Sequence, residues 1–396
     1  MSGGEGFAVE CVQRVLDAAA ALCGGAAVTV DPLHVAAAVR SERHMRVGGE
    51  ALAGFAPLSR FWRAADGWVR THANYPWHRD ALLCALRAEA ERVEAAIAAL
   101  PATEIEARVY AAGGLAVAVR TAGAWRAEAG DPGPLVATAA IAGAAPRPAV
   151  ASGRPVTGLR VLDLTRVIAG PVATRMLGAL GADVLRIDDP NRPELEMHQL
   201  DGLLGKRSAF LDLRTAAGRE RLEDLLAGAD VVVTGYRPGA LTGFGLDPDA
   251  LARRHPGLVI VALSAWGNAK GFAGRRGFDS LVQAASGIAL DYGDPGALPC
   301  QLLDHATGYL MAAASLEGVA RQRAEGGTHV ARLALAATAA HVLDGRRVED
   351  VDPDPAPYLQ RLGDVVAVAP PGAVAGEPLR WPGPPAPYGA AEPAWS

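Results

Sequence analysis

Two aspartates stand where the sequence predicts that a helix begins. Asp304 opens the helical segment of LDHATGYLM, and Asp279 comes directly before a predicted helix at Ser280–Ser286. An aspartate at a helix start accepts hydrogen bonds from unpaired backbone N–H groups and lies at the positive end of the helix dipole, which favours its ionised form. An ionised carboxylate can act as a nucleophile. Taken alone, Asp304 fits an ordinary helix cap better, and Asp279 fits either role equally well.

Common catalytic and cofactor motifs are absent from the sequence. The segment Gly205–Ser208 (GKRS) lacks the upstream glycine of a P-loop, because position 200 is Leu200. The sequence has no GxSxG, HExxH or GxGxxG pattern, and its nine histidines show no ligand-like grouping. We therefore expect no metal site and no nicotinamide cofactor.

Composition limits the class of protein. The chain has 396 residues, of which half are hydrophobic, and its net charge is −5. That length predicts two domains. No basic block is long enough to bind a nucleic acid, and no run of about 18 uncharged apolar residues predicts a membrane span. The four cysteines are scattered, and we expect no signal peptide and therefore a cytoplasmic protein with reduced thiols.

The pattern changes along the chain and divides it into four parts. Residues 1–142 predict a small α+β domain, with a β-hairpin at Phe61–Val69 around an Asp-Gly turn. Residues 143–157 are rich in Pro, Ala and Gly and predict a linker. Residues 158–345 alternate strands and helices, which predicts a large domain. Residues 346–396 form a proline-rich tail that we expect to wrap the surface.

The large domain opens with a strand–helix–strand unit. Val161–Leu164 and Ala182–Ile187 are short apolar runs typical of buried parallel strands, and Thr174–Leu180 between them has helical spacing. The loop at Thr165–Pro171 follows the carboxyl end of the first strand, where such folds bind ligands. The alternation continues beyond this unit and predicts an α/β fold with a doubly wound parallel sheet, Rossmann-like in its large domain.

The order of these segments resembles the family III CoA-transferases, the group that includes formyl-CoA transferase and α-methylacyl-CoA racemase. The resemblance covers about 180 residues and is carried by the segments LGKRSAFLDL (204–213), ADVVVTGYRPG (229–239), RGFDSLVQAASG (276–287) and LDHATGYLM (303–311). The segment ADGWV and the later GGLAVAVRTAGAW resemble the family's small domain, here placed before the large one.

This resemblance implies a reaction and a site. It implies that Asp304 attacks an acyl-CoA thioester to form a mixed anhydride, after which CoA passes to a carboxylic acid, and that Asp279 is an acidic residue beside the thioester. It also implies a homodimer. Because the small domain precedes the large one in this chain, whether the two chains interlock stays an open question. The residues that it implies for binding coenzyme A are Ile168, Ala169, Lys206, Gly235, Tyr236, Arg237 and Arg276.

Three positions depart from the family pattern. Gly235 replaces an asparagine, Gly243 replaces a frequent basic residue, and Phe278 replaces the histidine of the racemase branch. Two alternatives follow. The first is a racemase or epimerase in which His305 replaces the missing base, and the second is a non-catalytic relic of the fold that binds acyl-CoA.

Overall fold

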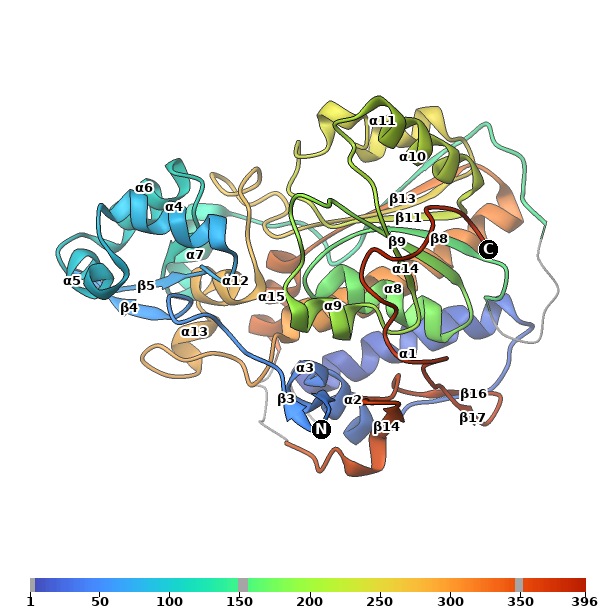
Figure 1. The fold of residues 1–396 in the computed structure, drawn as a ribbon, viewed down its shortest axis with the longest axis horizontal. Coiled ribbons are helices and arrows are strands. Elements are labelled where there is room, and N and C mark those ends of the chain that lie inside the picture. Colours follow the sequence, from blue (N-terminus) through green and yellow to red (C-terminus); the bar gives the residue numbers. More distant parts are fainter. Residues whose placement is uncertain (1–3, 149–155, 346–351) are drawn as a thin grey trace.

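A seven-stranded sheet forms the centre of the molecule (Figure 1). The computed structural model describes residues 4–148, 156–345 and 352–396. The strands run in the order β10-β9-β8-β11-β12-β13-β7, and all are parallel except β7, which pairs antiparallel with β13. Their bounds are β7 Ala137–Ile141, β8 Arg160–Leu164, β9 Asp183–Asp188, β10 Arg207–Phe210, β11 Val231–Thr234, β12 Val259–Ser264 and β13 Thr328–Ala334.

Helices cover both faces of this sheet. In Figure 1, α10 and α11 lie above it, whereas α8 and α14 lie below it with α1 outside them. The inner strands are buried because they separate two apolar clusters, one on each face, whereas the edge strand β7 is mostly exposed. The predicted α/β class with a doubly wound, mostly parallel sheet is therefore confirmed. The helices around the sheet are α1 Gly4–Leu22, α8 Ala169–Ala179, α9 Glu196–Gly202, α10 Ala216–Gly228, α11 Pro248–Arg254, α14 Leu302–Glu325 and α15 Leu335–Asp344.

A small lobe, residues 61–118, lies to the left of the sheet in Figure 1. Its core is the antiparallel sheet β4-β5-β6 with helices packed against it, and the predicted hairpin at Phe61–Val69 is present as β4 and β5. Helix α12 contacts β5 and β6 of this lobe as well as α15, and so connects the lobe to the large domain. The elements here are β4 Phe61–Arg63, β5 Trp68–Thr71, β6 Ala116–Ala118, α4 Pro76–Leu86, α5 Val93–Ala98, α6 Ala102–Ala111, α7 Ala122–Ala129, α12 Asp279–Ser286 and α13 Ile288–Asp291.

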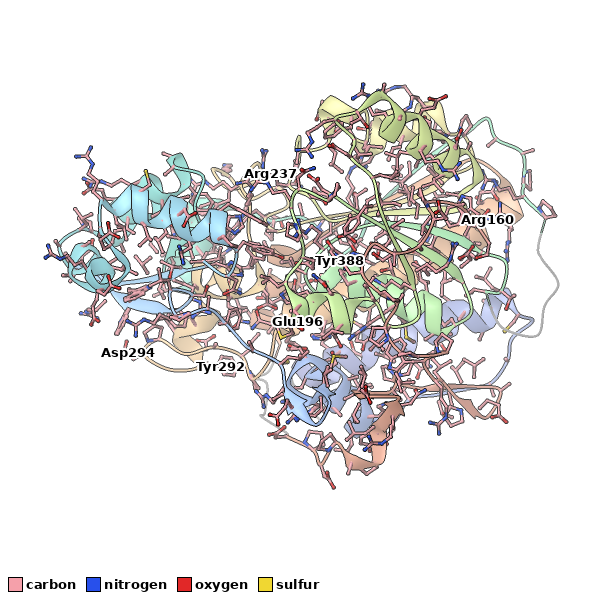
Figure 2. All side chains as sticks on the ribbon, viewed as in Figure 1. Arg160, Glu196, Arg237, Tyr292, Asp294 and Tyr388 are labelled. Carbon is pink, nitrogen blue, oxygen red and sulfur yellow. The ribbon has the colours of Figure 1, made fainter. Side chains whose placement is uncertain are left out.

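The C-terminal tail packs on the large domain and on the N-terminal segment. Strand β15 pairs with β2, and β16 pairs with β1. Tyr388 lies near the centre of Figure 2, where its hydroxyl accepts a hydrogen bond from the backbone N–H of Glu194 at 3.1 Å. The elements are β1 Val28–Thr29, α2 Pro32–Ala38, α3 Ser41–His44, β2 Arg46–Val47, β3 Glu50–Ala51, β14 Leu359–Leu362, β15 Val365–Val368, β16 Ala373–Val374 and β17 Glu377–Pro378.

The division into domains at residues 142, 157 and 345 stays a prediction. Parts of the predicted linker (149–155) and of the predicted tail (346–351) lie outside the described residues. From the first 142 residues, α1 packs on α14 and β7 joins the large sheet, so this segment supplies both the small lobe and part of the large domain. Within the described residues, no helix is long and apolar enough to cross a bilayer.

Helices α8 and α14 pack closely where they cross, because Gly308 of α14 lies against α8. A Cβ atom at Gly308 would lie 2.5 Å from the carbonyl oxygen of Ala169 and 2.8 Å from the Cβ of Val172. Neither the backbone oxygen nor a branched Cβ can move aside easily. The crossing therefore requires glycine at this position.

We predict that Gly308→Ala destabilises the protein by about 1–3 kcal/mol, because the new methyl group forces the two helices apart. Urea unfolding measures the loss. Gly123→Ala in α7 is the matched control, since nothing lies within 4 Å of its new Cβ. Equal stability of the two variants would contradict the close crossing.

Candidate active site

A cavity of about 550 Å³ opens between the carboxyl ends of the parallel strands and the small lobe. It is lined by the loops that follow β8, β9, β11 and β12 and by the start of α4. Strand β8 pairs with β9 on one side and with β11 on the other, so the chain order reverses here. Ligands of open α/β sheets bind at such a reversal point. We call this space the first cavity.

Five arginines line the first cavity: Arg166, Arg192, Arg237, Arg275 and Arg276. Arg166 pairs with Glu194 at 3.4 Å, and Arg275 pairs with Glu106 at 2.8 Å. The other three have no carboxylate partner among the described residues. Figure 2 shows Arg237 at the upper edge of the region between the small lobe and the large sheet.

The unpaired arginines act on one another. Burial lowers the pKa of Arg276, and the charges of Arg237 and Arg192 lower it further. Burial followed by the charges of Arg276, Arg166 and Arg192 also lowers the pKa of His78, another lining residue, to about 4. A field that disfavours added positive charge favours an anionic ligand.

Aromatic side chains line the same cavity. Tyr75 and Trp77 stack with ring centroids 4.8 Å apart, and the guanidinium of Arg192 lies 4.8 Å from the Trp77 ring centre. Tyr236, in the loop after β11, is half-buried, and burial raises its pKa to about 12, so its hydroxyl stays protonated. The cavity thus combines cations with flat rings on which a base can stack.

A second cavity, of about 700 Å³, meets the first one. Val167, Ile168, Phe278 and Asp304 line both cavities. The ring of Phe278 stacks on His72 with centroids 3.8 Å apart, and His72 lines the second cavity. These shared residues form the junction between the two spaces.

Asp304 is the ionisable side chain at this junction. It is the third residue of α14 and is 6% exposed, and no other described residue forms a hydrogen bond to its carboxylate. Burial raises its pKa well above the ordinary value, and the charges of Asp279 and Glu42 raise it further. The carboxylate is therefore free to meet a ligand from either cavity.

Asp279 lies behind Asp304 and lines neither cavity. Its Oδ2 accepts the backbone N–H of Asp304 at 2.9 Å, and its Oδ1 accepts a hydrogen bond from Gln283. Burial raises its pKa to about 6. The expectation that Asp304 itself accepts backbone N–H groups is wrong, because α14 begins at Leu302 and Asp279 takes the N–H of this first turn.

His305 lines neither cavity. Its side chain is fully buried, and its Nε2 lies 3.2 Å from Oε2 of Glu42. Burial opposes ionisation of Glu42, but His305, a backbone N–H and Arg175 together outweigh it and lower the pKa of Glu42 to about 2. His305 thus orders Glu42, and it does not reach the junction where a substituting base is needed.

The junction loop is held by Glu194. Val167 has φ 70°, a left-handed conformation that costs energy for a β-branched residue. Its backbone N–H donates to Oε2 of Glu194 at 3.0 Å, and Glu194 also accepts from the Tyr75 hydroxyl and pairs with Arg166 and Arg186. This buried network fixes the loop that precedes α8.

The family is decided by comparison with known proteins. The model of CoA-transferase family III matches residues 156–373, more than half of the chain. The chain belongs to CoA-transferase family III. The resemblance identified in the sequence is thereby confirmed.

Three curated family III relatives illustrate the similarity. The chain is 31% identical over 233 residues to the probable fatty acyl-CoA transferase Rv3272 of Mycobacterium tuberculosis, covering 52% of this chain and 59% of the relative. It is 32% identical over 163 residues to the succinate–glutarate CoA-transferase of Agrobacterium fabrum, covering 37% and 41%. It is 32% identical over 147 residues to the formyl-CoA:oxalate CoA-transferase of Escherichia coli, covering 34% and 35%.

A crystal structure of Rv3272 is 32% identical, covers 48% of this chain and 58% of its own, and has a TM-score of 0.45. This chain spans less than two thirds of the length of these three relatives.

Of the residues that the sequence predicted for coenzyme A, six line the first cavity: Ile168, Ala169, Gly235, Tyr236, Arg237 and Arg276. Lys206 does not. Its side chain is fully buried, and its Nζ lies 2.9 Å from Oδ2 of Asp163, which is also fully buried. This ion pair keeps Lys206 away from any ligand in the first cavity.

The sequence did not predict several residues that line the two cavities. Arg166 stands in the loop TRVIAG that the sequence singled out, so its position there was a usable signal. Trp77, Arg192 and Glu42 had no local signal, because only the packing of distant segments brings them to the cavities. Among the described residues, no group of three or more His, Cys, Asp or Glu side chains could hold a metal ion.

We predict that Lys206→Met destabilises the protein by about 3–5 kcal/mol, because it leaves the Asp163 carboxylate buried without its cation. Urea unfolding measures the effect, with the exposed Lys270→Met as the matched control. A stable Lys206→Met variant with weakened binding of coenzyme A would instead place Lys206 in the ligand site.

Proposed function

We propose that this chain is a CoA-transferase that moves CoA from an acyl-CoA thioester to a carboxylic acid through an anhydride on Asp304. The observation that carries the proposal is the position of Asp304 at the junction of two cavities. One cavity suits the nucleotide and thiol arm of coenzyme A, and the other suits the acyl group. The thioester carbonyl then lies at the junction, beside the Asp304 carboxylate.

The first cavity has the chemistry that coenzyme A requires. Arg192, Arg237 and Arg276 neutralise its phosphates, and Trp77 and Tyr236 provide ring faces for adenine or the pantetheine arm. The first turn of α8 at Ala169 adds backbone N–H groups that have no acceptor within the helix. The arginines also replace the cation that is missing at Gly243.

Each bond change can be assigned to named atoms. A carboxylate oxygen of Asp304 attacks the thioester carbon, the C–S bond breaks, and the electron pair leaves on the CoA thiolate. The acceptor carboxylate then attacks the Asp304 carbonyl carbon and releases the donor acid, which leaves the acceptor in a new anhydride. The CoA thiolate attacks the acceptor carbonyl, and the Asp304 carboxylate is restored. No net oxidant, reductant or water is consumed.

The surroundings of Asp304 favour this chemistry. A buried carboxylate with a raised pKa is a better nucleophile than an exposed one, provided that it is ionised. Burial also excludes the water that hydrolyses an anhydride. Asp279 acts as a positioning residue, because its hydrogen bond to the Asp304 backbone orients the first turn of α14 without touching a substrate.

We further propose that the protein is a cytoplasmic homodimer. Cys11, Cys23 and Cys84 form no disulfide bond among the described residues, which fits a reducing compartment. Racemisation is disfavoured, because Phe278 lines both cavities where the racemase branch has a histidine and His305 is directed toward Glu42. A non-catalytic relic is disfavoured by the unbonded carboxylate of Asp304.

We predict that wild-type protein, given a panel of acyl-CoAs and carboxylic acids in D₂O, forms new acyl-CoAs that contain no added deuterium. Asp304→Ala and Asp304→Asn should lower this rate by more than about a thousandfold, because each removes the nucleophile. Mass spectrometry of the CoA products measures both results. Asp224→Asn, which changes an exposed aspartate on α10, is the control.

Deuterium in the recovered donor without acyl exchange would contradict the transferase proposal and indicate a racemase. Binding of acyl-CoA with neither reaction across the panel would favour the relic.

We predict that kcat/KM rises with pH as Asp304 loses its proton, with an acid limb above the ordinary aspartate range. In Asp279→Asn this limb should move to lower pH, because one like charge beside Asp304 is gone while an oxygen remains to accept the backbone N–H. The pH–rate profiles of wild type, Asp279→Asn and the Asp224→Asn control test this. A limb that stays in place or moves to higher pH would contradict the coupling.

A further inference from the structure

The second cavity has apolar walls interrupted by a few polar groups. Its apolar lining includes Leu52, Phe55, Phe61, Met197, Phe278 and Leu298. Its cations are Arg43, Arg46 and Arg70. Such a space suits a carboxylic acid with a carbon chain or ring.

Two of these arginines are already engaged. Arg43 donates to the Pro299 carbonyl at 2.8 Å and lies 3.6 Å from Asp352. Arg46 donates to the carbonyls of Arg43 and Met45 at 2.7 and 2.8 Å. These bonds hold both guanidinium groups against the backbone at the wall.

Arg70 differs from them. It stands on β5, and its guanidinium carbon lies 5.4 Å from the Phe55 ring centre and 4.9 Å from that of Phe61. Its Nε is buried without an acceptor, and within the described residues the side chain of Arg70 forms no hydrogen bond or ion pair. The two rings lie near the guanidinium group, and its N–H groups have no acceptor among the described residues.

An unsatisfied cation of this kind is costly in the free protein. Burial lowers the pKa of Arg70 to about 10, and the nearest charge that opposes this is Asp279, whose oxygens are occupied by Gln283 and the Asp304 backbone. Two further lining residues carry buried polar atoms without a partner among the described residues, Ser280 at Oγ and His72 at Nδ1. Buried polar groups are nearly always satisfied in a finished structure, so these three groups are candidates for contact with a ligand.

We infer that the second cavity selects a dicarboxylic acid, whose reacting carboxyl group lies at Asp304 while its second carboxylate pairs with Arg70. This inference rests on the proposed function for the reacting end of the acid, whereas the pairing with Arg70 stands on the contacts above. A carboxylate matches the forked N–H edge of a guanidinium, and the phenylalanines pack on the carbon chain between the two ends. Arg70 is then a specificity-determining residue.

The test compares acids of equal length. We expect straight-chain dicarboxylates of four to eight carbons to include an acceptor with a kcat/KM at least about tenfold above that of its monocarboxylate counterpart. Arg70→Gln should lower kcat/KM for that dicarboxylate by about tenfold to a hundredfold and change the monocarboxylate by less than about twofold. Arg70→Lys keeps the charge without the fork and should fall between. Arg63→Gln, an exposed arginine on neighbouring β4, is the matched control.

A binding measurement separates this inference from the proposed function. Calorimetry with the free dicarboxylate, without any acyl-CoA, should show binding to wild type that Arg70→Gln weakens by a similar factor. If that holds but no acyl-CoA is formed, the inference stands and the transferase proposal fails. If transfer occurs with equal preference for both acid classes, or if Arg70→Gln and Arg70→Lys leave binding and kcat/KM unchanged, the inference is overturned while the transferase remains.

Discussion

The close crossing of α14 over α8 is the constraint on which the site depends. Because Gly308 lets the two helices touch at the Ala169 carbonyl, the first turn of α14 is brought beside the loop that opens α8. That contact sets Asp304 against Ile168, and the bond from Asp279 fixes the turn from behind. The small lobe then covers this turn through α12, which carries both Asp279 and the preceding Phe278. The position of the Asp304 carboxylate thus depends on Gly308, which allows α14 to contact α8.

The electrostatic division of the site follows from this arrangement. Arginines from the loops after β9, β11 and β12 surround the first cavity, whereas Asp279, Asp304 and Glu42 gather around the junction. The first cavity is therefore positively charged, whereas the junction carries several carboxylates close together. In the proposed reaction, the arginines would attract the nucleotide end of acyl-CoA, and the electrophilic carbon would be presented to an Asp304 oxygen whose charge is poorly solvated.

The sequence predicted the first two strands of the large domain closely, because each is a short apolar run: Val161–Leu164 and Ala182–Ile187 correspond to β8 and β9 within a residue. Strands β7 and β13 were not predicted, and the helix expected at Thr174–Leu180 begins five residues earlier, at Ala169. Asp304 was predicted from the order of its neighbouring segments, since nothing local distinguishes a nucleophile from a cap. Lys206 was predicted to bind the ligand because the sequence does not show that it pairs with the buried Asp163. Arg70, Trp77 and Arg192 depend on how the small lobe docks, which no local pattern encodes.

The packing of α1 against α14 has a consequence for how the chain is made. Arg14 of α1 pairs with Glu317, 303 positions later in the chain. Helix α1 therefore leaves the ribosome long before α14 exists, and its apolar face, including Val12, Val15 and Leu16, lacks the α14 surface in the meantime. Contacts of such long sequence separation slow folding and prolong the exposure of apolar surface during synthesis. Helix α1 is thus made long before α14, the helix on which it packs, and part of its apolar surface stays exposed until α14 has been synthesised.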